Sequence, residues 1–153
     1  MTKYIRDKSI LVVDDDTRML HALDKVLTAA GAAVIRAEWA GDAIDTLIEK
    51  QKRIDLVITD LRMPFVSGMT VVFAIHKLRP GLPVIVLTAF GSTDVKDECM
   101  RQGAAAFLEK PLNTKHLLEE VEKVLGEQKA RANPNAESEK PKEAQNSKSE
   151  VIF

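Results

Sequence analysis

Short, continuous apolar runs alternate with segments of helical period along the first 127 residues of the chain. A short unbroken apolar run is typical of a strand that is buried on both faces of a parallel sheet. Because such a sheet needs helices over both faces, the alternation indicates an α/β fold. The predicted strands are Ser9–Val13, Ala33–Ala37, Ile54–Thr59, Pro83–Thr88 and Ala105–Leu108.

The segments between these strands carry apolar side chains at the spacing of one helix face. A fourth helix, near Thr93–Gln102, has few large apolar residues, so we expect it to be the least firmly packed. Five βα units with right-handed crossovers predict a flavodoxin-like, doubly wound five-stranded parallel sheet. The apolar faces of the other four predicted helices are Met19, Leu23, Val26, Leu27 and Ala30, with Gly31 ending the helix; Ile44, Leu47 and Ile48; Met69, Val72 and Phe73, with Pro80 ending the helix; and Leu117, Leu118, Val121, Val124 and Leu125, with Asn113 as the cap and Gly126 ending the helix.

Composition changes once along the chain. Residues 128–150 are almost entirely polar or small and include two prolines, so this segment has too little apolar surface to offset its ordering entropy. We therefore predict one domain over residues 1–127 and a flexible C-terminal tail over residues 128–153, dispensable for chemistry. The lone tryptophan, Trp39, is expected to cover the sheet.

Charge and cysteine content exclude several classes of protein. The chain has 22 Lys and Arg against 23 Asp and Glu, which gives no electrostatic argument for nucleic-acid binding. No apolar stretch of about 18 residues marks a membrane span, and the expected location is the cytoplasm. The single cysteine, Cys99, excludes an internal disulfide and a cysteine-based zinc site.

Charged and hydroxyl side chains follow four of the predicted strands directly. The acidic run 14–16 follows the first strand, Asp60 the third, and Lys110 the fifth, while Thr88 ends the fourth. The carboxyl ends of parallel strands share one edge of the sheet, where ligands bind in such folds. We therefore expect carboxylates, a hydroxyl and an ammonium to meet there.

This set of groups favours a metal-assisted phosphoryl transfer. Two carboxylates about 4 Å apart repel by roughly 4 kcal/mol at an effective dielectric constant of about 20, so the cluster should hold a proton or recruit a cation. Oxygen ligands in a half-open site suit Mg²⁺, with Mn²⁺ as a substitute, better than Ca²⁺. A bound Mg²⁺ attracts phosphate oxygens, Lys110 and Thr88 can hold others, and a carboxylate can act as the nucleophile.

These residues resemble the receiver domain of two-component response regulators over roughly residues 8–126. The resemblance implies that Asp60 accepts a phosphoryl group from the phosphohistidine of a histidine kinase. It also implies that Mg²⁺ is bound by Asp15, Asp60 and the backbone carbonyl of Arg62, with Asp14 assisting through water. The matching segments are Ile10 to Asp16, Asp55 to Pro64, Gly68, Val86 to Ala89 and Phe107 to Pro111.

The resemblance further implies a switch that reports phosphorylation. Lys110 and Thr88 would contact the phosphoryl oxygens, and the bond between Lys110 and Pro111 matches one that is usually cis in the family. Phe107 stands at the aromatic switch position, where tyrosine is more familiar, so the ring but no hydroxyl is available. A Thr88 hydroxyl drawn towards the phosphoryl group would vacate space into which Phe107 could turn.

The function predicted on this basis is a stand-alone receiver that signals through its altered surface and catalyses only its own phosphorylation and dephosphorylation. Its expected partners are a histidine kinase or phosphotransfer protein and an unknown downstream protein. Nothing after Gly126 has a helix-turn-helix pattern, so we expect no direct nucleic-acid binding. The chain is expected to be a monomer or a phosphorylation-dependent dimer.

Three other functions compete with this prediction. In a haloacid-dehalogenase-type phosphatase, Asp14 and Asp16 would form an Asp-x-Asp pair, but Arg18 stands where that family favours Thr or Val, and a later acidic pair is missing. A flavin or nucleotide binder is disfavoured because the chain has no glycine-rich phosphate loop. A receiver-like interaction module without phosphorylation is disfavoured because the full acidic, Thr and Lys set is present.

Overall fold

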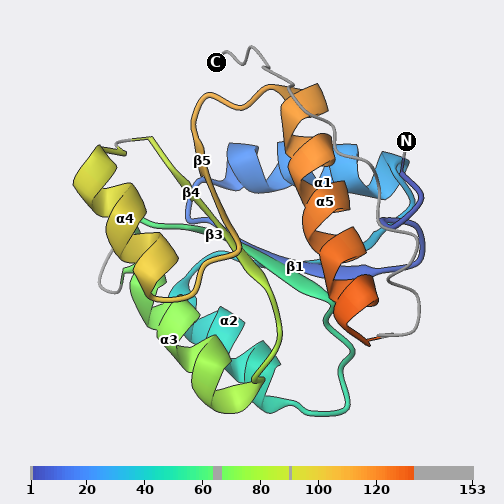
Figure 1. The fold of residues 1–153 in the computed structure, drawn as a ribbon, viewed down its shortest axis with the longest axis horizontal. Coiled ribbons are helices and arrows are strands. Elements are labelled where there is room, and N and C mark those ends of the chain that lie inside the picture. The colour runs from blue at the N-terminus through green and yellow to red at the C-terminus, as the bar shows by residue number, and fades with distance from the viewer. Residues whose placement is uncertain (1, 64–66, 90, 133–153) are drawn as a thin grey trace.

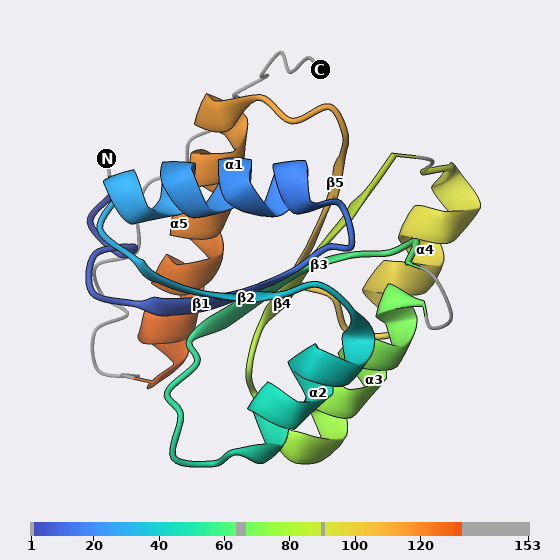
Figure 2. The ribbon, with the colours of Figure 1, turned by 180° about the vertical axis from the view of Figure 1, so that it is seen from behind.

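One five-stranded parallel sheet with helices on both faces forms the fold (Figures 1 and 2). The computed structural model describes residues 2–63, 67–89 and 91–132. The strand order β2-β1-β3-β4-β5 confirms the flavodoxin-like, doubly wound sheet. The elements are β1 Ser9–Val13, α1 Thr17–Ala29, β2 Ala33–Ala37, α2 Ala40–Ile48, β3 Leu56–Asp60, α3 Gly68–Leu78, β4 Val84–Thr88, α4 Thr93–Arg101, β5 Ala106–Glu109 and α5 Thr114–Ala132.

Two apolar cores lie on opposite faces of the sheet, because successive strand side chains point to opposite sides. On β3, Leu56 and Ile58 pack into the core beneath α1 and α5, whereas Val57 packs into the core beneath α2, α3 and α4. Figure 2 shows α1 and α5 on one side of the strands and α2 and α3 on the other. No helix in the described part of the chain is both long and apolar enough to cross a membrane.

The central strand differs from its predicted bounds. β3 begins at Leu56 rather than Ile54 and includes Asp60 as its last residue. Ahead of it, the Asp55 carboxylate accepts a hydrogen bond from the Ser9 N–H at 2.8 Å, while the Asp55 N–H donates to the Ser9 carbonyl at 2.7 Å. These bonds hold the segment before β3 against the start of β1. Because β3 ends at Asp60, this residue belongs to the sheet itself.

The last helix extends past its predicted end, so the prediction that Gly126 stops it is wrong. α5 continues to Ala132, and a Cβ atom at Gly126 would lie 3.1 Å from two ring carbons of Tyr4. The glycine makes room for this ring from the N-terminal segment, which packs against the helix. Residues 128–132 of the predicted tail thus continue α5, and residues 133–153 lie outside the described residues.

Two further expectations concern surface exposure. Trp39 does not cover the sheet: it follows the edge strand β2, precedes α2, and keeps 51% of its surface exposed. α4 is thinly packed, as predicted, because Cys99 is its one buried residue. Its first turn is capped by the Ser92 hydroxyl, which accepts a hydrogen bond from the Val95 N–H at 3.2 Å.

The end of α2 is held by one guanidinium group. Arg79 donates hydrogen bonds of 2.8–3.1 Å to three backbone carbonyls, those of Leu47, Glu49 and Lys52. We expect Arg79→Met to lower the free energy of unfolding by about 1–3 kcal/mol, because it leaves these carbonyls without their charged donor. Urea unfolding measures the loss. Arg101→Met, which removes an exposed guanidinium from α4, should change stability far less, and equal losses would contradict this role for Arg79.

Candidate functional site

Strand register brings the predicted site residues to one edge of the sheet. Val13 of β1 pairs with Thr59 of β3, so Asp14 and Asp60 follow paired residues on adjacent strands. The Thr88 position at the end of β4 pairs with Glu109, the residue before Lys110. The expectation that these groups share the carboxyl edge is therefore met.

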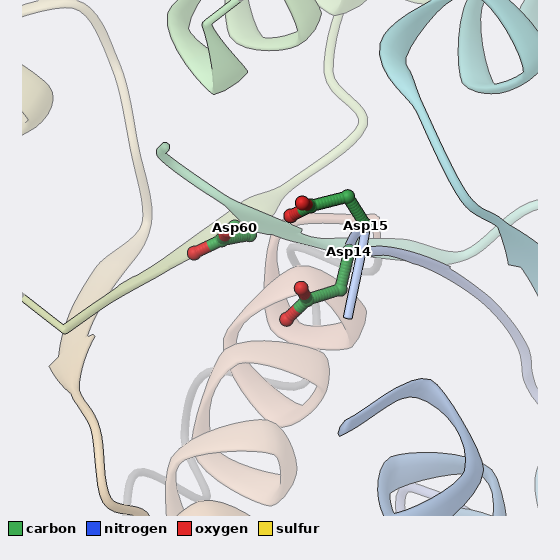
Figure 3. A group of neighbouring side chains, drawn as sticks. All are labelled: Asp14, Asp15 and Asp60. Carbon is green, nitrogen blue, oxygen red and sulfur yellow. The ribbon is translucent and has the colours of Figure 1, made fainter. Parts of the chain in front are cut away.

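Three carboxylates meet at this edge, as Figure 3 shows for the ends of β1 and β3. One oxygen from each of Asp14, Asp15 and Asp60 lies within 4.8 Å of the other two. Asp14 and Asp60 are buried, with 1% and 5% of their surfaces exposed, whereas Asp15 is exposed. The cluster is therefore closed towards the protein and open on one side to solvent.

The third acid of the run 14–16 has a structural role. The Asp16 carboxylate caps α1 by accepting hydrogen bonds from the N–H groups of Arg18 at 3.0 Å and Met19 at 3.4 Å. Its own N–H donates to the Asp14 carboxylate at 3.0 Å, which orients that buried side chain. Capping by a short acidic side chain is a common way to satisfy the first N–H groups of a helix.

Lys110 links the two buried carboxylates. Its Nζ lies 2.9 Å from Asp14 Oδ2 and 3.3 Å from Asp60 Oδ1, and the side chain is 16% exposed. The peptide bond between Lys110 and Pro111 is cis, as the family resemblance implies. Lys110 directly follows β5, and its side chain passes the end of β4 to place the ammonium group beside both acids.

Burial and repulsion perturb the ionisation of the cluster. Burial, with the negative charge of Asp14, raises the pKa of Asp60 from 3.8 to about 6, although the Lys110 ammonium acts in the opposite direction. Burial works to lower the pKa of Lys110, but its hydrogen bond with Asp14 and the charges of both acids outweigh that effect and raise it. Lys110 therefore stays cationic, and Asp60 changes charge near pH 6.

The donor set fits a hard divalent cation. Three carboxylates face a single ammonium, all the available ligand atoms are oxygens, and the open side leaves room for water. Arg62, whose carbonyl is the further ligand implied by the family resemblance, lies exposed two residues beyond Asp60. These residues suit Mg²⁺ or Mn²⁺ better than a softer metal that favours sulfur or imidazole ligands.

Gly68 allows α3 to begin directly against the end of β3. A Cβ atom at this position would overlap the carbonyl oxygen of Asp60 and lie 2.9 Å from Leu61 Cα. The Gly68 N–H also donates to the Leu61 carbonyl at 2.9 Å. Because Gly68 has no side chain, α3 can lie this close to β3, the strand that carries Asp60.

The two predicted switch residues lie on one face of the sheet. Thr88 is fully buried, and Val86, two residues before it, pairs with Phe107. Strand alternation therefore places Thr88 and Phe107 on the same side. A Cβ atom at Gly91 would lie 3.0 Å from two carbons of the half-buried Phe107 ring. Our sequence reasoning missed this glycine, and its place three residues after Thr88 was the one available signal.

The fold and the acidic edge define a receiver-type module, and comparison with known proteins identifies its family. A family model described as the response regulator receiver domain matches residues 10–122. The chain belongs to this family. It is 38% identical over 116 residues to the transcriptional regulatory protein GlrR of Escherichia coli (strain K12), with 76% of this chain aligned to 26% of that protein. The chain thus spans about a quarter of the length of this curated relative.

Solved structures agree with this assignment. A CheY-like response regulator receiver domain protein from Methanospirillum hungatei JF-1 has a TM-score of 0.77 and 32% identity, covering 82% of this chain and 98% of that one. A response regulator protein from Burkholderia pseudomallei, solved with a phosphorylated aspartic acid, a calcium ion and citrate, has a TM-score of 0.70 and 25% identity. It covers 85% of this chain and 75% of that one.

Proposed function

We propose that this receiver accepts a phosphoryl group on Asp60 from the phosphohistidine of a histidine kinase or phosphotransfer protein. The observation that carries the proposal is the setting of the Asp60 carboxylate. It is 5% exposed, 3.3 Å from the Lys110 ammonium, and within 4.8 Å of two further carboxylates. The Burkholderia pseudomallei relative, with its phosphorylated aspartic acid and calcium ion, supports the same chemistry here.

In the proposed transfer an ionised Asp60 oxygen attacks phosphorus and forms a P–O bond. The P–N bond to the donor imidazole breaks, and its electron pair stays on the imidazole nitrogen. Lys110 and Thr88 donate hydrogen bonds to phosphoryl oxygens, so the acyl phosphate is held from two sides. Asp15, Asp60 and the Arg62 carbonyl would bind Mg²⁺ or Mn²⁺, with Asp14 assisting through water. The bound metal would neutralise phosphoryl charge.

Water attack on phosphorus reverses the modification, so in this proposal the chain catalyses only its own phosphorylation and dephosphorylation. It signals through protein contacts, to an unidentified downstream protein, as a monomer or a phosphorylation-dependent dimer. It acts as a stand-alone receiver in the cytoplasm, without direct nucleic-acid binding. The intact mass of the protein isolated from its natural source tests whether the receiver stands alone.

A mass measurement tests the central chemistry. After incubation with acetyl phosphate and Mg²⁺, the intact protein should gain the mass of one phosphoryl group, and borohydride reduction should map the modification to residue 60. Sustained release of phosphate from phosphomonoesters without this adduct would instead support a phosphatase of the haloacid-dehalogenase type. The structure argues against that alternative, because Asp16, the second acid of its pair, caps α1.

Thr88→Ala is expected to separate phosphorylation from its consequence. The variant should still gain a phosphoryl group but should lose most of the response of β5 and α4, because no hydroxyl moves towards the phosphoryl oxygens. Amide NMR spectra with and without beryllofluoride measure that response. Thr70→Ala, at an exposed position of α3, serves as the control. A wild-type response in the Thr88 variant would contradict the proposed switch.

A further inference from the structure

An exposed aromatic side chain stands at the start of α2. Trp39 is the one tryptophan of the chain, and 51% of its surface is exposed. Its ring lies against the helix backbone at Gly41, where a Cβ atom would come within 2.7 Å of Trp39 Cζ3. One part of the indole is therefore supported by the protein, and the remainder faces solvent.

The sheet places Trp39 near the acidic edge. Ala37, the last residue of β2, pairs with Val13, and its carbonyl accepts a hydrogen bond from the Asp14 N–H at 3.1 Å. The two residues from Ala37 to Trp39 extend roughly 7 Å, the two strand spacings from Ala37 to Thr59 are about 10 Å, and the step from Thr59 to Asp60 adds about 4 Å. The backbone of Trp39 therefore lies within roughly 21 Å of the Asp60 backbone, before the length of the indole is considered.

This distance matters for a protein phosphodonor but not for a small one. A standard interface buries about 800 Å² on each partner, which corresponds to a disc of roughly 16 Å radius. A protein that brings a phosphohistidine to Asp60 must centre its contact near that residue. The rim of such a contact comes within about 5 Å of the Trp39 backbone, a gap that an indole side chain is long enough to span, whereas acetyl phosphate or phosphoramidate needs only the acidic cluster.

The surroundings of Trp39 are negatively charged. Glu38 and Asp42 flank it along the chain, and both are exposed. Within the described residues, neither of these two carboxylates forms a salt bridge. An apolar ring bordered by unpaired acids is complementary to a surface that combines an apolar pocket with Lys or Arg side chains.

We propose that Trp39, with Glu38 and Asp42, is a docking anchor for the protein that donates the phosphoryl group. The donor would present an apolar pocket with a basic border beside its phosphohistidine. Tryptophan at such a position contributes more binding energy than most contact residues, and the acids speed encounter with a basic partner. This inference rests on the proposed phosphorylation of Asp60 and adds a specific surface to it.

Comparing two phosphoryl donors tests the anchor. One donor is phosphoramidate, and the other is the autophosphorylated histidine kinase that transfers fastest to the wild-type protein among those purified from the same organism. We expect Trp39→Ala to slow transfer from the kinase at least ~10-fold and to leave the phosphoramidate rate within about twofold. Trp39→Phe, which keeps a ring, should restore most of the kinase rate.

A matched control and a salt series complete the design. Phe73→Ala removes another ring, 58% exposed on α3, and should leave both rates near wild type. Raising the salt concentration should slow the kinase reaction of the wild type more than that of a Glu38→Gln, Asp42→Asn double variant.

Each outcome of this comparison decides the question. Equal loss with both donors, no loss with the kinase, or no transfer from any kinase to a wild type that phosphoramidate labels would each overturn the docking anchor. Failure of phosphoramidate to label wild-type Asp60 would instead overturn the proposed function itself.

Discussion

Asp60→Asn should abolish formation of the acyl phosphate and, at the same time, stabilise the metal-free protein above pH 6. Asparagine keeps the shape of the side chain but cannot supply the attacking oxygen. It also removes a buried charge that Asp14 repels. Intact mass after acetyl phosphate treatment measures the first effect, and urea unfolding in EDTA measures the second. Asp45→Asn, at an exposed position of α2, is the control.

The pH dependence of this stabilisation follows from the direction of the shift. The pKa of Asp60 is raised from 3.8 to about 6, so the folded protein holds this proton more tightly than the unfolded chain. The resulting stability is fully present below pH 4 and is lost as the pH rises through about 6, on the order of 3 kcal/mol in total. The neutral asparagine side chain of the variant has no such loss. A stability advantage of the variant that shrank between pH 4 and pH 7 would contradict the assignment.

Removal of divalent metal should reduce phosphorylation at least ~100-fold, because the phosphoryl oxygens would then approach three carboxylates without a metal ion to offset their charge. The rate in excess EDTA, and its recovery on addition of Mg²⁺ or Mn²⁺, measures this dependence. Phosphorylation that is undiminished in EDTA would count against the metal site.

Asp15→Asn should raise the Mg²⁺ concentration needed for half-maximal phosphorylation, because it removes one ligand. The same change relieves repulsion within the cluster, so the metal-free variant should be at least as stable as the wild type. Asp16→Asn is a close control: the new amide oxygen can still cap α1, and Asp16 is not among the three clustered carboxylates. Equal shifts in the two variants would show that the effect is not specific to the ligand.

The strands could be predicted from the sequence because a parallel strand that is buried on both faces consists of consecutive apolar residues. β1, buried along almost its whole length, has its predicted bounds, and any polar group just after such a run must lie at the carboxyl edge. Gly126 was misinterpreted for a different reason. Its role depends on Tyr4, which lies more than a hundred residues earlier in the chain, and no local pattern reports that contact.

The same limit applies to the site. The order of the strands, and with it the gathering of Asp14, Asp60 and Lys110, was predictable. That Lys110 lies nearer to Asp14, at 2.9 Å, than to Asp60, at 3.3 Å, depends on side-chain geometry that spacing along the chain does not encode. The exposure of Trp39 was missed because an apolar tryptophan is expected to be buried. Its position directly after the edge strand β2 was the one sign that few neighbours would cover it.

The thin packing of α4 has a consequence for how such a protein can diverge. Cys99 is buried, Val95 is half-buried, and the other residues of the helix are exposed. Substitutions at exposed positions generally change stability by less than about 0.5 kcal/mol, so most of this helix can be rewritten one mutation at a time. The strand ends that carry the carboxylates permit no such drift. After gene duplication, the α4 surface of one copy can therefore change and bind a new partner while the acidic site at the strand ends stays the same.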